Sequence, residues 1–304
     1  MFQPHYISLY RTGRLSERIE EARKLLHDCQ ICPRRCRVNR YENELGVCGI
    51  GKLPKISSYN PHFGEEPPLV GTHGSGTIFI TSCNLGCVFC QNYDISHLRD
   101  GYEVSFERLA QMMIELQNRG CHNINFVTPT HVVPHILQAL PIAIKEGLRI
   151  PLVYNTGGYD LVETLQLLDG VFDIYMPDFK FSDSDVAAKW CRARNYPQVV
   201  MEAIREMHRQ VGDLVVNARG IAERGLIVRH LVMPNGLAGT RKVMQFLAQK
   251  ISSHTYVNIM DQYHPCGLAR KYPEINRCIN EKEFEDALRI AREEGITRLD
   301  GQAI

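Results

Sequence analysis

The sequence has almost no net charge and no long apolar run. Lys and Arg total 35 against 34 for Asp and Glu, which leaves a formal net charge of +1 over 304 residues. This balance gives no overall attraction to nucleic acid or to an anionic membrane, so a nucleic-acid substrate is not favoured. Nowhere do about 18 uncharged apolar residues run together, so we expect no membrane-spanning helix and no membrane partner.

The amino-terminal segment also lacks the features of an export signal. It reads MFQPHYISLYRTGRLSERIEEARKLL, without a basic start followed by an apolar stretch. We therefore expect a cytoplasmic protein made without a signal peptide.

Cysteine, in contrast, is abundant. The chain has 11 cysteines, and seven of them fall into two tight groups. In a reducing compartment, such groups hold metal more often than they form disulfides.

The alternation of short apolar runs with helical patterns from Gly76 onward predicts an α/β fold with a parallel sheet. Several runs are almost entirely apolar, as expected for strands buried on both faces. The predicted strands cover residues 76–82, 123–128, 150–155, 171–176, 226–232 and 255–260. Six βα units predict a partial (β/α)6 barrel rather than a flat doubly wound sheet.

Apolar spacing predicts helices over residues 14–27, 105–120 and 281–295. Asp160 to Glu163 resembles a capping box with the aspartate as the cap. The segment between Cys48 and Gly76 is dense in Gly, Pro and Ser, which is typical of a boundary. We therefore divide the chain into a small helical and cysteine-rich module (residues 1–75) and a barrel with a closing helix (residues 76–304).

Three cysteines, Cys83, Cys87 and Cys90, follow the first predicted barrel strand with the spacing C-x3-C-x2-C. This βα loop lies at the end of the sheet where such folds build their sites. A [4Fe-4S] cluster usually takes four thiolates, so three would leave one iron open to an external ligand. The alternative is a structural zinc site completed by a distant residue such as Cys121 or His97.

The stretch TSCNLGCVFCQN resembles the radical S-adenosylmethionine superfamily, in particular the subgroup similar to pyruvate formate-lyase activating enzyme. The hallmark of that superfamily is this loop after the first strand of a partial (β/α)6 barrel. The resemblance implies a [4Fe-4S] cluster on Cys83, Cys87 and Cys90, with S-adenosylmethionine bound to the open iron. An electron from the cluster would then cleave the sulfonium to give a 5'-deoxyadenosyl radical.

The resemblance also implies residues that hold S-adenosylmethionine at the ends of the second and third strands. The superfamily usually has a Gly-Gly-Glu-like turn after the second strand, but here Thr128 and Thr130 stand in its place. Recognition of the methionyl amine would then rest on hydroxyls and backbone carbonyls. Thr130 is equally well placed to be a helix N-cap. Asn155, at the end of the third strand, could hydrogen-bond the cofactor.

Later strand ends supply the charged residues of the implied site. Asp178 and Lys180 are two residues apart and so project to one side of an extended segment. The resemblance assigns Lys180 to the methionyl carboxylate, and the alternative is a surface ion pair. Arg229 lies within an apolar strand and needs either the cofactor carboxylate or an internal acid as its partner. His264, after the sixth strand, is the candidate for ribose contact.

The second group, Cys29, Cys32, Cys36 and Cys48, has the spacing C-x2-C-x3-C-x11-C. Four thiolates can close a zinc site or bind an iron-sulfur cluster, and the spacing leaves both open. Four arginines lie among these cysteines, either as a surface for an acidic partner, as a field that tunes a cluster, or as a solvated face: Arg34, Arg35, Arg37 and Arg40.

These features predict a radical S-adenosylmethionine enzyme that takes electrons from a donor such as flavodoxin or ferredoxin. The leading substrate hypothesis is a backbone glycine of a glycyl-radical enzyme. The alternatives are radical modification of another peptide, an RNA or a small metabolite. A different class of function is a non-catalytic scaffold or electron carrier that binds iron-sulfur or zinc.

Overall fold

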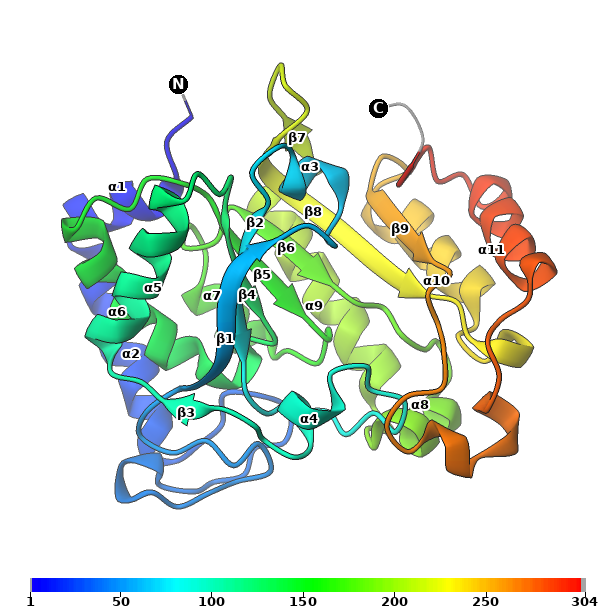
Figure 1. Ribbon diagram of the computed structural model, residues 1–304, viewed down its shortest axis with the longest axis horizontal. Helices are drawn as coiled ribbons and strands as arrows, with labels where there is room; N and C mark the ends of the chain where they lie inside the picture. The colour runs from blue at the N-terminus through cyan, green and yellow to red at the C-terminus, as the bar shows by residue number, and fades with distance from the viewer. Residues whose placement is uncertain (1, 302–304) are drawn as a thin grey trace.

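The computed structural model describes residues 2–301, and within them a ten-stranded sheet forms the centre of the molecule (Figure 1). The strands are β1 (Lys55–His62), β2 (Ser75–Ile80), β3 (Tyr102–Glu103), β4 (Ile124–Val127), β5 (Leu152–Thr156), β6 (Ile174–Pro177), β7 (Val215–Val216), β8 (Ala222–Leu231), β9 (Tyr256–Met260) and β10 (Arg298–Leu299).

The strand order is β10-β9-β8-β6-β5-β4-β2-β1-β3, with β7 paired to β8. All neighbours from β2 to β10 along this path pair in parallel, whereas β1 pairs antiparallel with both β2 and β3. The two ends of the path, β10 and β3, do not pair with each other, so the sheet is not closed. The predicted α/β class with a partial barrel is therefore confirmed.

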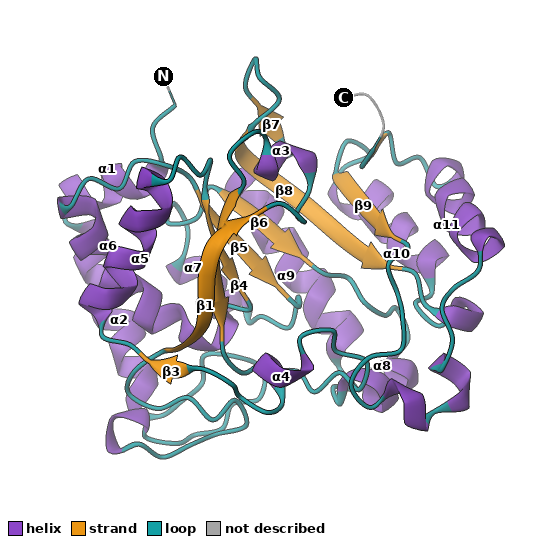
Figure 2. Ribbon diagram, in the orientation of Figure 1, coloured by secondary structure: helices purple, strands orange, loops and turns teal. Residues whose placement is uncertain are grey.

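Helices cover the outside of the sheet (Figure 2). They are α1 (His5–Arg11), α2 (Arg14–His27), α3 (Pro67–Val70), α4 (Tyr93–Ser96), α5 (Phe106–Asn118), α6 (Val133–Lys145), α7 (Val162–Leu167), α8 (Ser184–Cys191), α9 (Tyr196–Val211), α10 (Thr240–Phe246) and α11 (Glu281–Glu293). On one side α6 packs against both α5 and α2, and on the other α10 packs against α11. No helix of the described residues is both long and apolar enough to cross a bilayer.

Local sequence explains why these elements begin and end where they do. The Ser105 side chain caps α5 by accepting a hydrogen bond from the Arg108 amide at 3.1 Å, and Gly120 follows the helix with a left-handed φ of 88°. Strands β5 and β6 are buried along their whole length, as the apolar runs predicted.

The predicted capping box at Asp160 is wrong. The cap residue of α7 is Leu161, whose side chain makes no capping hydrogen bond. Asp160 is buried instead, and its carboxylate accepts hydrogen bonds from the Tyr154 and Thr156 hydroxyls at 2.9 and 2.7 Å. Two hydroxyls from the preceding strand satisfy the carboxylate, so the helix starts without it.

The segment before residue 76 is more closely joined to the barrel than the predicted boundary implies. It contributes β1, which extends the sheet beyond β2. Buried residues of the first two helices, such as Tyr6 and Leu15, belong to the same hydrophobic core as Leu137 of α6. The cysteine-rich loop of residues 29–51, by contrast, carries little regular structure apart from one short 3-10 turn.

Candidate functional site

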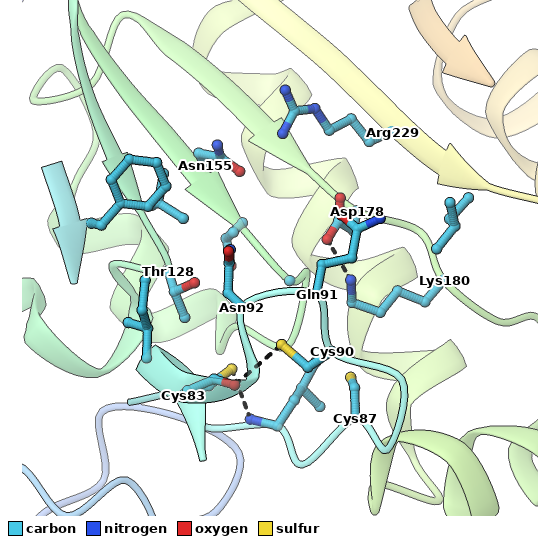
Figure 3. Close-up of a pocket in the computed structure, with 18 of the residues that line it drawn as sticks. Cys83, Cys87, Cys90, Gln91, Asn92, Thr128, Asn155, Asp178, Lys180 and Arg229 are labelled. Atoms are coloured by element: carbon cyan, nitrogen blue, oxygen red, sulfur yellow. Dashed lines mark hydrogen bonds and ion pairs between the residues drawn. The ribbon is translucent and has the colours of Figure 1, made fainter. Parts of the chain in front are cut away.

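A cavity of about 390 Å³ opens at the carboxyl ends of the parallel strands (Figure 3). Six parallel strands, or the loops that follow them, contribute to its wall: β2, β4, β5, β6, β8 and β9. Most of the site residues predicted from the sequence line it: Cys83, Cys87, Cys90, Thr128, Asn155, Asp178, Lys180 and Arg229.

The three-cysteine loop begins directly after β2. Ser82 has a left-handed φ of 75°, and its amide donates to the Ile95 carbonyl at 3.0 Å, which turns the chain at the strand end. The Leu85 amide donates to Cys83 Sγ at 3.3 Å, and the Ser96 hydroxyl to Cys90 Sγ at 3.1 Å. Hydrogen bonds to sulfur of this kind stabilise thiolates and tune a bound cluster.

Backbone hydrogen bonds join the three-cysteine loop to the end of α8. The Val88 amide donates to the Trp190 carbonyl at 3.0 Å, and the Gly86 amide to the Cys191 carbonyl at 3.2 Å. Cys191 also brings its sulfur within 3.2 Å of Cys87 Sγ, in the buried layer beneath the loop. The sequence analysis missed this contact, since 104 residues separate the two cysteines and no local pattern joins them.

Without metal, the three thiols are protonated at neutral pH. Burial raises the pKa of Cys83 to about 12 and also raises that of Cys90. The hydrogen bond with Cys191, together with burial, raises the pKa of Cys87 well above its usual value. Metal loading must therefore displace these protons, as is general for thiolate sites.

The donor set fits a [4Fe-4S] cluster with one open iron. Three cysteines line the cavity, and in a cubane each thiolate would bind a different iron. Neither Cys121 nor His97 lines the cavity, so the proposed completion of a zinc site has no ligand there.

Asp178 and Lys180 form an ion pair on the cavity wall, drawn with a dashed line in Figure 3. Both side chains are largely buried, so the surface ion pair considered above is not what the structure contains. Burial lowers the pKa of Lys180, but the Asp178 charge outweighs this effect and holds the pKa well above its usual value. Lys180 is therefore a fixed cation beside the cysteine loop.

Arg229 lines the same cavity and already has internal partners. Its guanidinium donates two hydrogen bonds of 2.7 Å to the Glu66 carboxylate and also pairs with Glu65. Burial would raise the pKa of Glu66, but Arg229 and a hydrogen bond from Asn258 lower it overall, so the carboxylate is ionised. Of the two alternatives for Arg229, the structure contains the internal acid.

The second and third strand ends bring polar groups to the cavity. Thr128 has a left-handed φ of 61°, and its amide donates to the Asn155 carbonyl at 2.7 Å. Both residues line the cavity, whereas Thr130 does not. Thr130 is buried with its hydroxyl 3.0 Å from that of Thr156, and the cap position of α6 belongs to Val132.

His264 is exposed, and its ring nitrogen Nδ1 lies 3.1 Å from the Gln262 carbonyl. It does not line the cavity, unlike Asn258, Met260 and Gln262, which alternate along β9 and its extension. His264 therefore lies outside the cavity of this structure. Gln262 lies on the cavity wall instead.

The second cysteine group also converges. Cys29, Cys32, Cys36 and Cys48 line one small cavity on the far side of the backbone of the three-cysteine loop, together with Arg34 and Arg40. Asn84 lines this second cavity, while its neighbours Cys83 and Leu85 line the first.

The fold and the site together define an α/β barrel protein built to hold an iron-sulfur cluster at its open end. Residues 77–221 match the Radical SAM superfamily. The chain is 36% identical over 286 residues to "Uncharacterized protein MJ0674" of Methanocaldococcus jannaschii, covering 91% of this chain and 78% of that protein. The chain belongs to the radical SAM superfamily.

One solved structure agrees at the level of the fold. A crystal structure of HydG, a maturase of the [FeFe]-hydrogenase, superposes with a TM-score of 0.50 at 12% identity. The match covers 72% of this chain and 49% of HydG, so this chain spans about half of that protein's length. HydG from Carboxydothermus hydrogenoformans gives a TM-score of 0.49 at 12% identity, with 73% and 52% covered.

Membership confirms the superfamily resemblance and implies a [4Fe-4S] cluster and S-adenosylmethionine as cofactors. It supports cleavage of S-adenosylmethionine by a radical mechanism. The narrower resemblance to pyruvate formate-lyase activating enzyme, and the role of each cavity residue, stay predictions.

Proposed function

We propose that this protein binds S-adenosylmethionine in the cavity at the strand ends and abstracts a hydrogen atom from a substrate presented at its mouth. The observation that carries the proposal is the convergence of the cysteine loop with polar residues from the other core strands on one cavity. When bound, the cluster and S-adenosylmethionine supply one electron and a 5'-deoxyadenosyl radical.

Each wall of the cavity has a task in this proposal. Cys83, Cys87 and Cys90 hold the cluster, and the Ser96 hydroxyl orients one of these sulfurs. Lys180 binds the methionyl carboxylate, since its ammonium group is a cation fixed beside the loop.

The methionyl amine needs hydrogen-bond acceptors. Thr128 and Asn155 offer a hydroxyl and an amide oxygen on the adjoining wall. Glu65, which also lines the cavity, adds a carboxylate that the sequence analysis did not select. Glu65 shares the Arg229 guanidinium with Glu66, so these three groups together leave one net negative charge on this wall, which suits the methionyl amine.

The proposed substrate is a backbone glycine of a partner enzyme, delivered as a peptide segment. A cavity of about 390 Å³ lies near the lower limit for sites that enclose one small-molecule ligand, which is roughly 300 Å³. S-adenosylmethionine alone would fill most of it, so the substrate must approach from outside. With one S-adenosylmethionine consumed, one electron from reduced flavodoxin or ferredoxin and one hydrogen atom taken from the substrate would yield methionine, 5'-deoxyadenosine and a substrate radical.

The test is paramagnetic resonance of the anaerobically reconstituted, reduced protein with and without S-adenosylmethionine. We expect a cluster signal that shifts with the cofactor in the wild type and is lost in the Cys83→Ala, Cys87→Ala, Cys90→Ala variant. Cys278→Ala is the matched control, since Cys278 is exposed and lies outside both groups.

Two outcomes would contradict the proposal. A protein that binds only zinc would be a scaffold, and a cluster that ignores S-adenosylmethionine would make it an electron carrier. If the shift occurs but no glycyl radical forms on any partner, the substrate assignment fails while the radical chemistry stands. Modification of another peptide, an RNA or a small metabolite would then remain to be tested by 5'-deoxyadenosine release.

A further inference from the structure

The second cavity gathers four cysteines from one loop between α2 and β1. Cys29, Cys32, Cys36 and Cys48 all line it, and none forms a disulfide. The loop is shaped by its own backbone, since the Cys29 amide donates to the Val38 carbonyl at 3.0 Å and the Arg37 amide to the Cys29 carbonyl at 3.0 Å. Four thiols separated by up to 19 positions thus share one enclosed space.

Arg40 is the charged residue buried most deeply beside these cysteines. It is 1% exposed, and its Nη1 donates to the His131 carbonyl at 2.9 Å. Its Nε and Nη2 are buried and have no hydrogen-bond partner among the described residues. A buried guanidinium left in this state is costly, so the site calls for an anion.

No described carboxylate can supply that anion. The residues around the cavity are Cys, Ile, Val, Gly, Asn, His and Arg, and no Asp or Glu is among them. Arg40 also forms no salt bridge within residues 2–301. The negative charge that would satisfy Arg40 must therefore come from thiolates, which persist in a buried site when a metal centre holds them.

We propose that Cys29, Cys32, Cys36 and Cys48 ligate a second iron-sulfur cluster, with Arg40 as its buried counter-ion. Four thiolates on a cubane carry net negative charge, which matches the unpartnered guanidinium. This inference does not depend on the proposed substrate or on the binding of S-adenosylmethionine.

The spacing favours a cluster over a zinc ion. Cys29, Cys32 and Cys36 fall within eight residues, as in iron-sulfur sites, whereas zinc sites usually take their ligands as two separated pairs. Gly46 leaves room for one of these cysteines, because a Cβ atom at this position would lie 2.8 Å from Cys36 Sγ. A side chain at Gly46 would push Cys36 out of the cavity.

Hydrogen bonds connect the wall of the second cavity to the three-cysteine loop. Arg34 Nε donates to the Asn84 carbonyl at 2.8 Å, and its Nη1 to the Arg192 carbonyl at 2.8 Å. His131, whose carbonyl binds Arg40, places its Nε2 2.9 Å from the Thr81 carbonyl. A cluster in this cavity would therefore lie directly behind the loop that holds the first one.

The test counts metal in the full chain after anaerobic reconstitution. In the Cys83→Ala, Cys87→Ala, Cys90→Ala variant we expect iron and acid-labile sulfide in equal amounts, and their loss when Cys32→Ala and Cys48→Ala are added. The wild type should hold about twice the iron of the triple variant. Cys278→Ala should leave the content unchanged. The iron content of the wild type alone distinguishes one cluster from two, so the test holds even if a variant folds poorly.

Arg40 is tested by the reduction potential of the cluster in the same triple-variant background. A nearby cation stabilises the more negative, reduced cluster, so Arg40→Met should shift the potential downward and Arg40→Lys should restore it. Resistance of the iron to a chelator should fall about 10- to 100-fold in Arg40→Met. A merely structural arginine would leave the potential unchanged.

Three results would overturn the inference. One is zinc without sulfide in the triple variant, and another is a folded triple variant with no metal. The third is wild-type iron that accounts for a single cluster only. None of these bears on whether the first cluster responds to S-adenosylmethionine, so failure here and failure of the proposed function are distinguishable.

Discussion

At the scale of single residues, Lys180 offers the most direct test of the proposed cofactor site. It is a cation held by Asp178 at the cavity wall, and its amide also donates to the Tyr196 hydroxyl at 3.0 Å. This amide contact fixes the backbone regardless of the side chain, so a substitution at Lys180 changes the charge more than the shape.

Lys180→Met should weaken binding of S-adenosylmethionine. A hydrogen bond to a charged group contributes about 1.5 to 3 kcal/mol, so the dissociation constant should rise about 10- to 100-fold. The measurement is a titration of the cluster signal or equilibrium dialysis with the labelled cofactor. Lys189→Met is the control, since Lys189 is half-exposed and pairs with Glu274. Equal affinity in both variants would remove Lys180 from the site.

Sequence reasoning selected residues that line the cavity but missed some of their partners, because those partners are far away along the chain. Asp178 and Lys180 are two positions apart, so strand geometry alone brings them together. The partner of Arg229 could not be read in this way, because Glu66 is 163 positions earlier. The pair Glu65 and Glu66 stands in a Gly- and Pro-rich stretch that reads as a boundary.

At the scale of elements, the turn after β5 determines how closely the end of β6 can approach it. Gly158 has a φ of +79°, and a Cβ atom there would lie 2.4 Å from the Asp178 carbonyl oxygen. The Tyr196 hydroxyl donates to this same carbonyl at 2.7 Å. The glycine therefore lets two strand ends approach closely enough to place Asp178 and Lys180 on the cavity wall.

Gly158→Ala should weaken both stability and cofactor binding. Gly147→Ala is the matched control, since Gly147 also has a positive φ, +101°, but nothing lies within 4 Å of its Cβ position. Backbone strain should cost each variant about 1 to 2 kcal/mol in denaturant unfolding, and the close contact with the Asp178 carbonyl should make Gly158→Ala the less stable of the two. Only Gly158→Ala should also reduce the spectral response to S-adenosylmethionine. A normal response would mean that the strand ends move apart without disturbing Lys180.

The sequence predicted the six longer parallel strands but not β1 or the two-residue parallel strand β10. The parallel strands are apolar runs buried on both faces, whereas β1 is mostly half-buried and carries Ser, Asn and Pro. Its pairing with β2 is a long-range contact that no periodicity signals. Asp160 failed for a different reason: its partners Tyr154 and Thr156 are near in sequence, and the hydroxyls of β5 outcompeted the capping pattern.

At the scale of the whole molecule, buried histidines make stability depend on pH. Burial lowers the pKa of His230 to about 4, while an unfolded histidine titrates near 6.5. Above pH 6.5 the residue is neutral in both states. As the pH falls from 6.5 toward 4, only the unfolded chain takes up the proton, so stability is lost over that window.

Comparing the free energy of unfolding at pH 7 and pH 5 measures this effect. Protonation of unfolded His230 should cost about 2 kcal/mol by pH 5. His230→Gln keeps a side chain able to reach the Phe179 carbonyl and the Thr240 hydroxyl but cannot titrate. The variant should therefore lose about 2 kcal/mol less than the wild type. Parallel losses in both proteins would show that His230 is not coupled to unfolding.

The cysteine-rich loop has its hydrogen-bond partners far along the chain, at Asn84 and Arg192. During translation, the four thiols of this loop leave the ribosome well before Arg192 is made, on the order of 10 s at ordinary synthesis rates. For that interval they are uncovered and open to oxidation. With the proposed second cluster, loading of this loop would be a late event, because its partners at Asn84 and Arg192 must first be made and folded.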